Sequence, residues 1–328
     1  MRKGKKMGRL IAVTIFLSFM TFIIPKSGLS QQKYPENPIT IIFGWGPGGQ
    51  LDIFTRILGN AASKILGQPI VVEYKPGAHG LIAAHTILRS KPDGYTLGIG
   101  NSTQFLIASN MQKVDFDPMN DPTWIMTFLH YDLGLCVRSD SPWKTWEEFK
   151  AYAKQNPGKV TYSCAAVGGA QHLAMETIAR KEGIKWVLIP FPSGNGPVIA
   201  LLGGHVEATI QGPADVIPHI QAGKLRFLLS FNKGRWPIAP DAPYLGELGY
   251  DNTFSYCGVY GPKGLPESIR TKLEYAFHEA MKDQVFVDAG HKSQLTIVYV
   301  GGNEITKMIK ERFPKYKKLV EDMGLVEK

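Results

Sequence analysis

The chain has 328 residues, of which 44% are hydrophobic and 20% charged, and it carries a formal net charge of +9 at neutral pH. This length exceeds the usual size of a single hydrophobic core, so we expect two domains. Its three cysteines include no C-x-x-C pair, so the sequence gives no indication of a structural zinc site.

The first thirty residues have the layout of a secretory signal peptide. A basic segment over 2–9 precedes an apolar run over 10–24, which is short for a membrane span of roughly 20 residues. Small residues at Gly28 and Ser30 predict cleavage near Ser30 and export to the periplasm, with an uncleaved anchor as the alternative. Removing 1–30 takes away six cations and no acids, and the remaining charge of +3 requires no nucleic-acid partner.

Strand and helix signals then alternate, which predicts an α/β fold with largely parallel sheets. A strand over 39–45 leads into a glycine-rich loop and an amphipathic helix that ends at Gly67. The expected apolar stripe of this helix is Phe54, Ile57, Leu58, Ala61 and Ile65. Strands are expected over 70–74 and 95–99, with a short helix between them.

The same alternation continues to the end of the chain. Thr145 and Glu148 form a capping box that predicts the start of a helix, which Pro157 stops. Further strands are expected over 160–163, 186–190 and 256–260. Further helices are expected over 170–178, 266–282 and 303–323, the last with Lys315, Lys317 and Lys318 on its solvated face.

Four strand ends lead into loops of small residues that precede a helix, at 46–49, 76–80, 165–170 and 192–196. Glycines let the backbone approach a ligand, and the first turn of a helix offers unpaired N–H groups with a partial positive charge. Such a site binds a carboxylate or phosphate without any charged side chain. In open α/β sheets these loops gather at the carboxyl ends of the strands, so we expect a shared binding cleft.

The first of these loops also matches a dinucleotide-binding pattern. Gly44, Gly46 and Gly49 spell G-x-G-x-x-G between a strand and a helix, and Glu73 follows near the end of the next strand. An NAD-dependent oxidoreductase of the Rossmann type is therefore an alternative. Export and the presence of Pro47 inside the loop argue against it.

Other catalytic or metal-binding patterns are weak. The sequence contains no G-x-S-x-G elbow, no H-E-x-x-H motif and no G-K-[ST] phosphate loop, so we expect no enzyme activity, no metal and no cofactor. Asp52 is expected first as a helix cap, with a ligand-binding role as the alternative. We expect Cys136, Cys164 and Cys257 in hydrophobic cores, with a disulfide between two of them as the alternative.

Motifs spread over the whole chain after residue 33 carry a family resemblance. They include Pro47-Gly48-Gly49-x-x-Asp52-x-x-x-Arg56, Pro92-Asp93-Gly94-Tyr95-Thr96-Leu97, Leu202-Gly203-Gly204-His205-Val206 and Gly223-Lys224-Leu225-Arg226. Each motif alone is weak, but their order and spacing are specific. The chain resembles the Bug family, the extracytoplasmic solute receptors of tripartite tricarboxylate transporters.

The resemblance implies a two-lobed periplasmic binding protein, type II-like, that closes on a small carboxylate like a Venus flytrap. We expect lobe one to comprise 31–130 and 231–328, and lobe two 131–230. Such a receptor acts as a monomer and delivers its ligand to the permease subunits of a tripartite tricarboxylate transporter. A periplasmic co-sensor that presents ligand to a signalling kinase is the alternative.

The resemblance also implies ligand contacts from both lobes. The expected ligand-binding residues are Trp45, Pro47, Gly48, Gly49, Asp52, His79, Gly80, Asn101, Ser102, Ala166, Gly168, Gly169, Phe191 and Ser193. Trp45 stands where the family usually has Phe, so we expect an aromatic or aliphatic mono- or dicarboxylate. We expect its carboxylate on the amides of Gly48 and Gly49, beneath the Trp45 indole.

Overall fold

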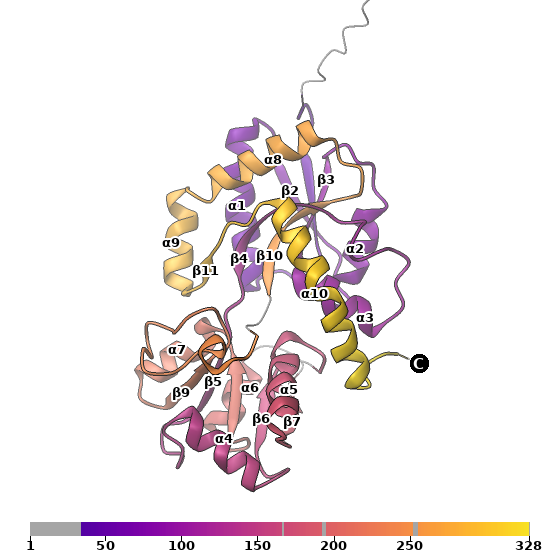
Figure 1. Cartoon of the computed structure of the whole chain (residues 1–328). Coiled ribbons are helices and arrows are strands. Elements are labelled where there is room, and N and C mark those ends of the chain that lie inside the picture. The colour runs from indigo at the N-terminus through magenta and orange to yellow at the C-terminus, as the bar shows by residue number, and fades with distance from the viewer. Residues whose placement is uncertain (1–33, 166, 192–194, 252–254, 328) are drawn as a thin grey trace, which may run out of the picture. The chain divides into compact units, whose positions relative to one another are not determined.

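A computed structural model describes residues 34–165, 167–191, 195–251 and 255–327. The chain divides into two units, Met1–Tyr34 and Pro35–Lys328, and the second contains both sheets. Figure 1 shows the order of helices and strands along the chain. Across the described ranges, no helix combines the length and the apolar character that a membrane crossing requires.

One sheet has six strands, and we call it and its helices lobe one. The strand order is β11-β4-β10-β3-β1-β2, with β1 parallel to both β2 and β3, and with β10, β4 and β11 added by antiparallel pairing. The strands are β1 (Ile39–Phe43), β2 (Ile70–Tyr74), β3 (Thr96–Asn101), β4 (Thr123–His130), β10 (Tyr256–Gly261) and β11 (Thr296–Ile297).

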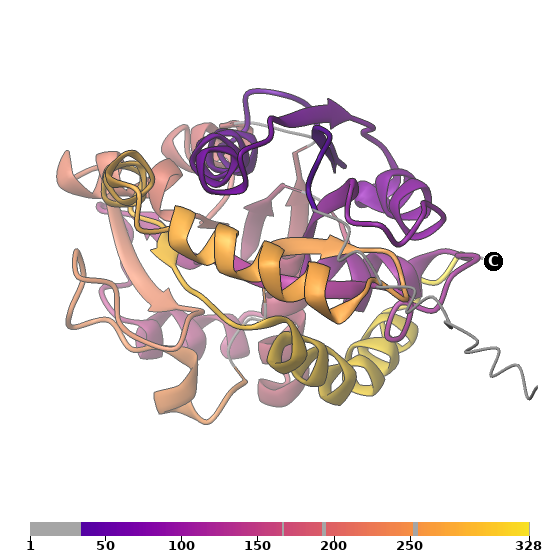
Figure 2. The ribbon, with the colours of Figure 1, turned by 90° about the horizontal axis from the view of Figure 1, so that it is seen from above.

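Helices cover both faces of this sheet. They are α1 (Gln50–Leu66), η1 (Ala78–Gly80), α2 (Leu81–Leu88), the π-helix η2 (Gln104–Ala108), α3 (Ser109–Met111), α8 (Glu267–Ala280), α9 (Gln284–Ser293) and α10 (Gly302–Asp322). Phe286 of α9 packs edge-on against Phe54 of α1, with ring centroids 5.5 Å apart. Residues of α2, η2 and α10 share a separate core, and Figure 2 shows α1 and α9 on the opposite side from α2 and α10.

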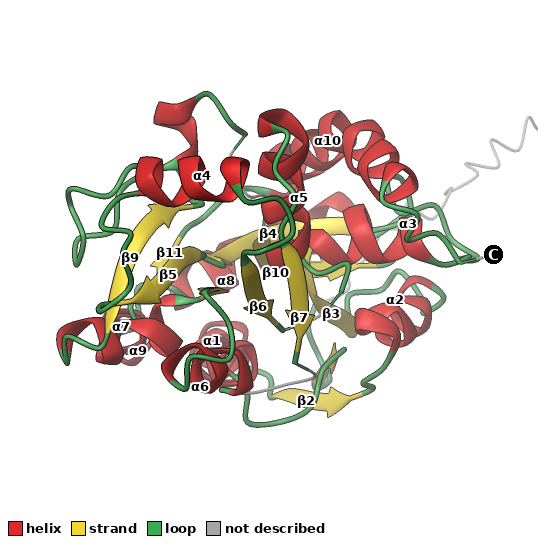
Figure 3. Cartoon of the chain, turned by 90° about the horizontal axis from the view of Figure 1, so that it is seen from below, coloured by secondary structure: helices red, strands yellow, loops and turns green. Residues whose placement is uncertain are grey.

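The second sheet has five strands in the order β7-β6-β8-β5-β9, and with its helices it forms lobe two. The strands are β5 (Gly134–Arg138), β6 (Thr161–Cys164), β7 (Val187–Pro190), β8 (Ala208–Gln211) and β9 (Leu225–Ser230). The helices are α4 (Trp146–Gln155), α5 (Ala170–Glu182), α6 (Gly196–Leu202), α7 (Pro213–Gln221) and η3 (Leu245–Leu248). Figure 3 shows α4 and α5 on one side of the strands and α6 and α7 on the other.

The residues that follow β9 pack with lobe two. Phe231, Leu245 and Tyr250 are buried in the core that α4 and α5 form over the sheet, and Trp236 is buried in the core beneath α6 and α7. Alternate side chains of β5 supply both cores, because successive residues of a strand point to opposite faces.

The segment that follows β4 connects the lobes, and it is hydrogen-bonded to its neighbours at both ends. At one end, the amide of Tyr131 donates to the carbonyl of Ser255 at 2.8 Å. At its other end, the Phe231 amide donates to the Leu133 carbonyl at 3.0 Å, and the Leu133 amide donates to Oδ1 of Asn232 at 3.1 Å. Each lobe therefore pairs with one end of the same short connection.

Several local predictions are confirmed. Gly67 ends α1 with a left-handed φ of 71°, a conformation that glycine adopts without steric cost. The capping box of Thr145 and Glu148 begins α4 with both reciprocal hydrogen bonds present. Lys315, Lys317 and Lys318 lie exposed on α10, as expected.

Other predictions need correction. The sheets are mixed rather than largely parallel, because β4, β5, β9 and β10 join by antiparallel pairing and their apolar patterns carried no signal for direction. β1 ends at Phe43 instead of Trp45, since a Cβ at Gly44 would lie 2.9 Å from the Cα of Gly80. Ile65 is exposed, and α1 buries Leu51 and Ala62 in its place.

All three cysteines are buried, in separate places, and none is in a disulfide. Cys136 lies in the core beneath α6 and α7, and Cys164 lies in the core under α4 and α5. Cys257 is in β10, where burial raises the pKa of its thiol. The possible disulfide is therefore not formed.

The close packing of β10 against β4 gives a stability test. A Cβ at Gly258 would lie 2.3 Å from the carbonyl oxygen of Met126 and 3.0 Å from the Cα of Thr127. Because both atoms belong to the backbone and cannot move aside easily, Gly258→Ala should lower the free energy of unfolding by about 1–3 kcal/mol or more. Gly234→Ala is the control, since nothing lies within 4 Å of its added Cβ. Equal unfolding free energies for the two variants in urea would contradict this packing.

Candidate functional site

A cavity of about 410 Å³ receives residues from both lobes and from the connections between them. Its size falls in the usual range for small-molecule sites. The lining residues are Phe43, Trp45, Gly46, Gly49, Gln50, Leu51, Asp52, Asn101, Thr103, Tyr131, Leu133, Ala165, Ala170, Gln171 and Ser255. Among these described residues there is no lysine, arginine or histidine.

The first turn of α1 forms one wall, and its shape depends on Asp52. Oδ2 of Asp52 accepts the amide of Gly48 at 2.8 Å, four residues back along the chain. Oδ1 accepts the Tyr74 hydroxyl at 2.6 Å and Nε of Arg56 at 3.1 Å. The Asp52 carboxylate is nearly buried, so three donors satisfy a charge that would otherwise be costly to remove from water.

This network corrects the expected position of the ligand carboxylate. The amide of Gly48 already donates to Asp52, so it is not the open donor that we expected. Gly49 is the N-cap of α1, with φ of −72° and ψ of 163°, and a Cβ added there would meet nothing within 4 Å. The first helical amides, from Gln50 and Leu51, have no carbonyl partner within the helix and belong to residues that line the cavity.

The first turn of α5, from lobe two, also contributes to the cavity wall. Gly169 is its N-cap, and Ala170 and Gln171 line the cavity. The amide of Gly168 donates to Nδ1 of His172 at 2.9 Å. Burial lowers the pKa of His172, so its imidazole is neutral at pH 7.

Trp45 is positioned by a tight turn that follows β2. Gly77, Ala78, His79 and Gly80 all have positive φ values, which is strained backbone for Ala78 and His79. A Cβ at Gly80 would lie 3.2 Å from Cζ2 of Trp45, so the indole occupies the space of the missing side chain. The buried Gln104 secures the turn, because its Nε2 donates to the carbonyl of Gly80 at 2.5 Å.

Four of the expected ligand-binding residues line this cavity: Trp45, Gly49, Asp52 and Asn101. Asn101 is held in place, since its Nδ2 donates to Oγ of Ser255 and its Oδ1 accepts from Thr103. Gly48 and Gly80 are not lining residues, but each contacts one: Gly48 is hydrogen-bonded to Asp52, and Gly80 packs close to Trp45.

The other expected residues that the structure describes are not in the lining. Pro47 and His79 are exposed away from it, and Ser102 is buried with its hydroxyl accepting the Tyr256 amide. Phe191 packs against the core beneath α6 and α7 instead. Gly168 and Gly169 precede the lining residues of α5. Ala166 and Ser193 lie outside the described residues.

Sequence reasoning missed eight lining residues, which are Phe43, Gln50, Leu51, Thr103, Tyr131, Leu133, Gln171 and Ser255. Tyr131, Leu133 and Ser255 belong to the connections between the lobes, which carry no glycine motif. Burial raises the pKa of Tyr131, so it faces the cavity as a neutral hydroxyl. Gln50 and Gln171 each follow a predicted glycine loop directly, and this position is the signal that could have found them.

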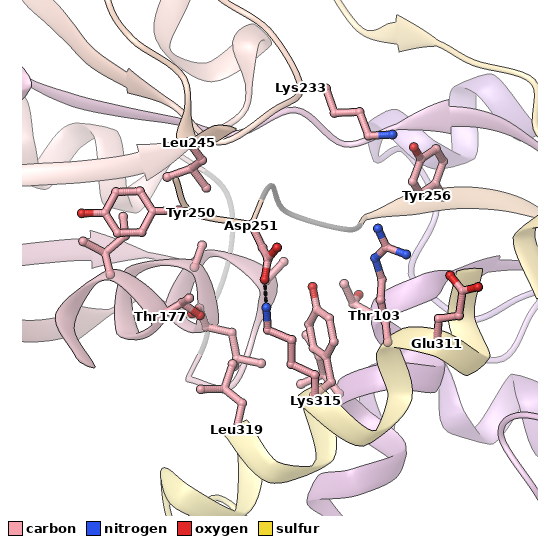
Figure 4. Close-up of a pocket in the computed structure, with 17 residues that line it drawn as sticks. Thr103, Thr177, Lys233, Leu245, Tyr250, Asp251, Tyr256, Glu311, Lys315 and Leu319 are labelled. Carbon is pink, nitrogen blue, oxygen red and sulfur yellow. Dashed lines mark hydrogen bonds and ion pairs between the residues drawn. The ribbon is translucent and has the colours of Figure 1, made fainter. Parts of the chain in front are cut away.

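A neighbouring cavity of about 270 Å³ lies between α5 and α10 and shares Thr103 and Ala170 with the first (Figure 4). Lys315 of α10 forms an ion pair with Asp251 there, and Glu311 adds a second acid (Figure 4). Because opposite charges already line this space, it is a less suitable anion site than the cavity between the helix N-termini.

Metal chemistry finds no support among the described residues. No group of three or more histidine, cysteine, aspartate or glutamate side chains is placed to hold an ion in the part of the chain that the structure covers. His130 and Asp132 are adjacent, with Nδ1 and Oδ1 2.9 Å apart. The Asp132 carboxylate also accepts the hydroxyl of Thr296 through Oδ2.

Curated relatives match the chain over nearly its full length. A protein described as "UPF0065 protein in gbd 5'region" from Cupriavidus necator is 37% identical, over 89% of this chain and 89% of the relative. The protein BugT from Bordetella pertussis is 30% identical, over 97% of this chain and 98% of BugT.

Solved structures agree with the two-lobed fold. A TctC solute-binding protein from Polaromonas, solved without ligand, has a TM-score of 0.79 at 29% identity, over 88% of this chain and 99% of that one. Two structures at 24% identity show the fold alone. They are a Rhodopseudomonas palustris protein with adipate, with TM-score 0.73 over 89% of this chain and 98% of that one, and R. palustris MatC with bound malate, with TM-score 0.71 over 88% and 100%.

The model of one protein family covers most of the chain. It is described as the tripartite tricarboxylate transporter family receptor, and it matches residues 54–325. The dinucleotide alternative loses its support, because Gly44 serves the close approach to Gly80 and the sheet adds antiparallel strands beside β3. This chain belongs to the tripartite tricarboxylate transporter receptor family, and its fold is that of a two-lobed solute-binding receptor.

Proposed function

We propose that this receptor captures a small organic carboxylate in the 410 Å³ cavity and delivers it to the permease subunits of a tripartite tricarboxylate transporter. One observation carries the proposal: the first turns of α1 and α5 line the same cavity, and the described lining contains no cationic side chain. An anion is then held by helix amides and dipoles, which need no counter-ion.

The rest of the lining favours a ligand with an apolar body. Phe43, Trp45, Leu51 and Leu133 contribute apolar surface beside the amides. An aromatic or aliphatic mono- or dicarboxylate matches this combination better than a densely hydroxylated acid. Adipate and malate are present in solved proteins of the same fold, which supports a carboxylate of modest size.

We place the receptor in the periplasm, exported by a signal peptide cleaved near Ser30. Its two-lobed relatives include a periplasmic transporter structure at 30% identity. The receptor needs only binding and release, so we expect its ligand to leave unchanged, without catalysis or a cofactor.

We propose that the lobe boundaries follow the packing of the connections. Lobe two then extends from 131 to about 250, because Phe231, Trp236 and Tyr250 lie in its cores. This places the second boundary some twenty residues later than the expected 231. Lobe one comprises the described residues up to 130 and those from 255 onward.

Gly49→Val tests the anion site at α1. The added side chain has room in the fold but covers the first-turn amides, so binding of adipate and benzoate should be lost in calorimetry. The melting temperature should fall by about 2–4 °C at most, since valine is a poorer N-cap than glycine by about 1 kcal/mol. Gly234→Val, outside this cavity, should bind like the parent. If Gly49→Val bound both acids with unchanged affinity, the anion would have to bind at the first turn of α5 instead.

Trp45→Ala tests the apolar wall. Losing the indole should weaken binding of an aromatic acid such as benzoate by about 1–3 kcal/mol. A small polar acid such as malate should lose much less, because it covers less of the indole. Trp45→Phe should retain most of the affinity for both. An equal loss for benzoate and malate in Trp45→Ala would show that Trp45 does not contact the ligand body.

Asp52→Asn tests the network that shapes the α1 loop. Burial alone would raise the pKa of Asp52, but the hydrogen bonds from Gly48, Tyr74 and Arg56 lower it. Because the pKa of Asp52 is lower in the folded protein, its charged form stabilises the fold at pH values above its ordinary pKa of about 3.9. This stabilisation is lost as the pH falls through the pKa of the folded state.

The stability difference between parent and Asp52→Asn should therefore be constant from pH 7 to about pH 5 and shrink below about pH 4. Urea unfolding at several pH values measures it. A difference of the same size at pH 7 and pH 3 would mean that the charge of Asp52 does not stabilise the loop.

A further inference from the structure

The two helix starts that face the cavity are built in the same way, although they lie in different lobes. Gly48 and Gly168 both have left-handed φ values, of 86° and 76°. Each is followed by a glycine N-cap in extended conformation, Gly49 with φ of −72° and Gly169 with φ of −75°. Each helix then begins at the next residue.

The third helical residue closes both loops in the same manner. Asp52 accepts the amide of Gly48 at 2.8 Å, and His172 accepts the amide of Gly168 at 2.9 Å. Both bonds join residues four apart and use the amide that precedes the N-cap. The sequences Gly48-Gly49-Gln50-Leu51-Asp52 and Gly168-Gly169-Ala170-Gln171-His172 therefore specify one local structure.

The hydrogen bond fixes the protonation of His172. A backbone amide can only donate, so Nδ1 must carry a lone pair and the ring proton must be on Nε2. Burial lowers the pKa of the imidazole, which agrees with a neutral ring. His172 is itself buried, so water competes poorly for Nδ1.

We infer that His172 is a positioning residue: as the Nε2–H tautomer, it holds the glycine loop of lobe two in the shape that Asp52 gives the loop of lobe one. In this shape the first turn of α5, with Ala170 and Gln171, presents its amides to the cavity. This role in ligand capture rests on the proposed function, whereas the tautomer and the loop contact do not.

The loop of Gly168 also packs against lobe one. A Cβ at Gly168 would lie 2.5 Å from Cε of Met111, so this glycine is pressed against α3 and has no side chain of its own to fix it. The bond to His172 is the side-chain contact that holds the Gly168 amide toward α5. Without it, the amide would have to turn to another acceptor, and the N-cap geometry of Gly169 would change with it.

The ligand-free protein provides the first test. In ¹⁵N-labelled protein at pH 7, the His172 ring should show an unprotonated Nδ1 and a protonated Nε2, with its signals assigned by their loss in His172→Asn. The amide of Gly168 should exchange with deuterium at least about tenfold faster in His172→Leu than in the parent, because a hydrogen bond is lost. The matched control is His278→Leu, whose ring stacks on Tyr299 away from the cavity, and it should leave Gly168 exchange unchanged.

Binding of adipate and benzoate provides the second test. His172→Leu removes the acceptor and should weaken both acids by about fivefold to tenfold, the scale of one hydrogen bond. His172→Asn keeps an acceptor oxygen and should stay within about threefold of the parent, as a rescue by the conservative variant. His278→Leu should bind like the parent.

The outcomes separate this role from the proposed function. A protonated Nδ1, or unchanged Gly168 exchange in His172→Leu, would overturn the assignment of His172 whatever the protein binds. If neither acid binds the parent, but the His172 tautomer and the Gly168 exchange rates are as expected, then His172 positions the loop and the proposed choice of carboxylate is wrong. Equal binding by His172→Leu and the parent would show that the loop does not serve the ligand.

Discussion

The short connection over residues 131–133 governs how this receptor is assembled. It is the point at which the chain leaves the six-stranded sheet for the five-stranded one, and its ends are bonded to different lobes. The Tyr131 amide donates to Ser255 beside β10, whereas Leu133 exchanges hydrogen bonds with Phe231 and Asn232 after β9. Because Tyr131 and Leu133 also line the cavity, a change in the angle between the lobes would alter the cavity wall directly.

In the function proposed for this cavity, the backbone rather than a cationic side chain supplies the positive charge that holds the anion. Two helices begin there, and the donors of their first turns have no carbonyl partner inside the helix. A lysine or arginine in the same place would hold an anion more tightly but would release it more slowly. Amide donors suit a receptor, whose ligand must be both captured and passed on.

The fold was predictable where the signal is local. The capping box of Thr145, the glycine end of α1 at Gly67 and the alternation of strands and helices depend on neighbouring residues, and these predictions are confirmed. The direction of β4, β5, β9 and β10 depends on partners far along the chain, and an apolar strand looks the same in either direction. The antiparallel pairs were missed for this reason.

The candidate site was partly predictable for the same reason. Trp45, Gly49 and Asp52 adjoin a glycine motif, and all three line the cavity. Tyr131 and Ser255 reach it only because the chain passes between lobes, which no local pattern records. The hydrogen bond from the Gly48 amide to Asp52 could not be predicted either, because it requires the side chain of Asp52 to fold back over one turn of helix.

The paired loops differ in one respect, and this difference gives the cavity a polarity. The first turn of α1 contains the carboxylate of Asp52, whereas the first turn of α5 contains no acid and a neutral His172. The positive end of α1 is thus partly compensated before a ligand arrives, but that of α5 is not. The two helix starts therefore offer an anion different surroundings, which are the ion pair of Asp52 with Arg56 at α1 and a neutral imidazole at α5.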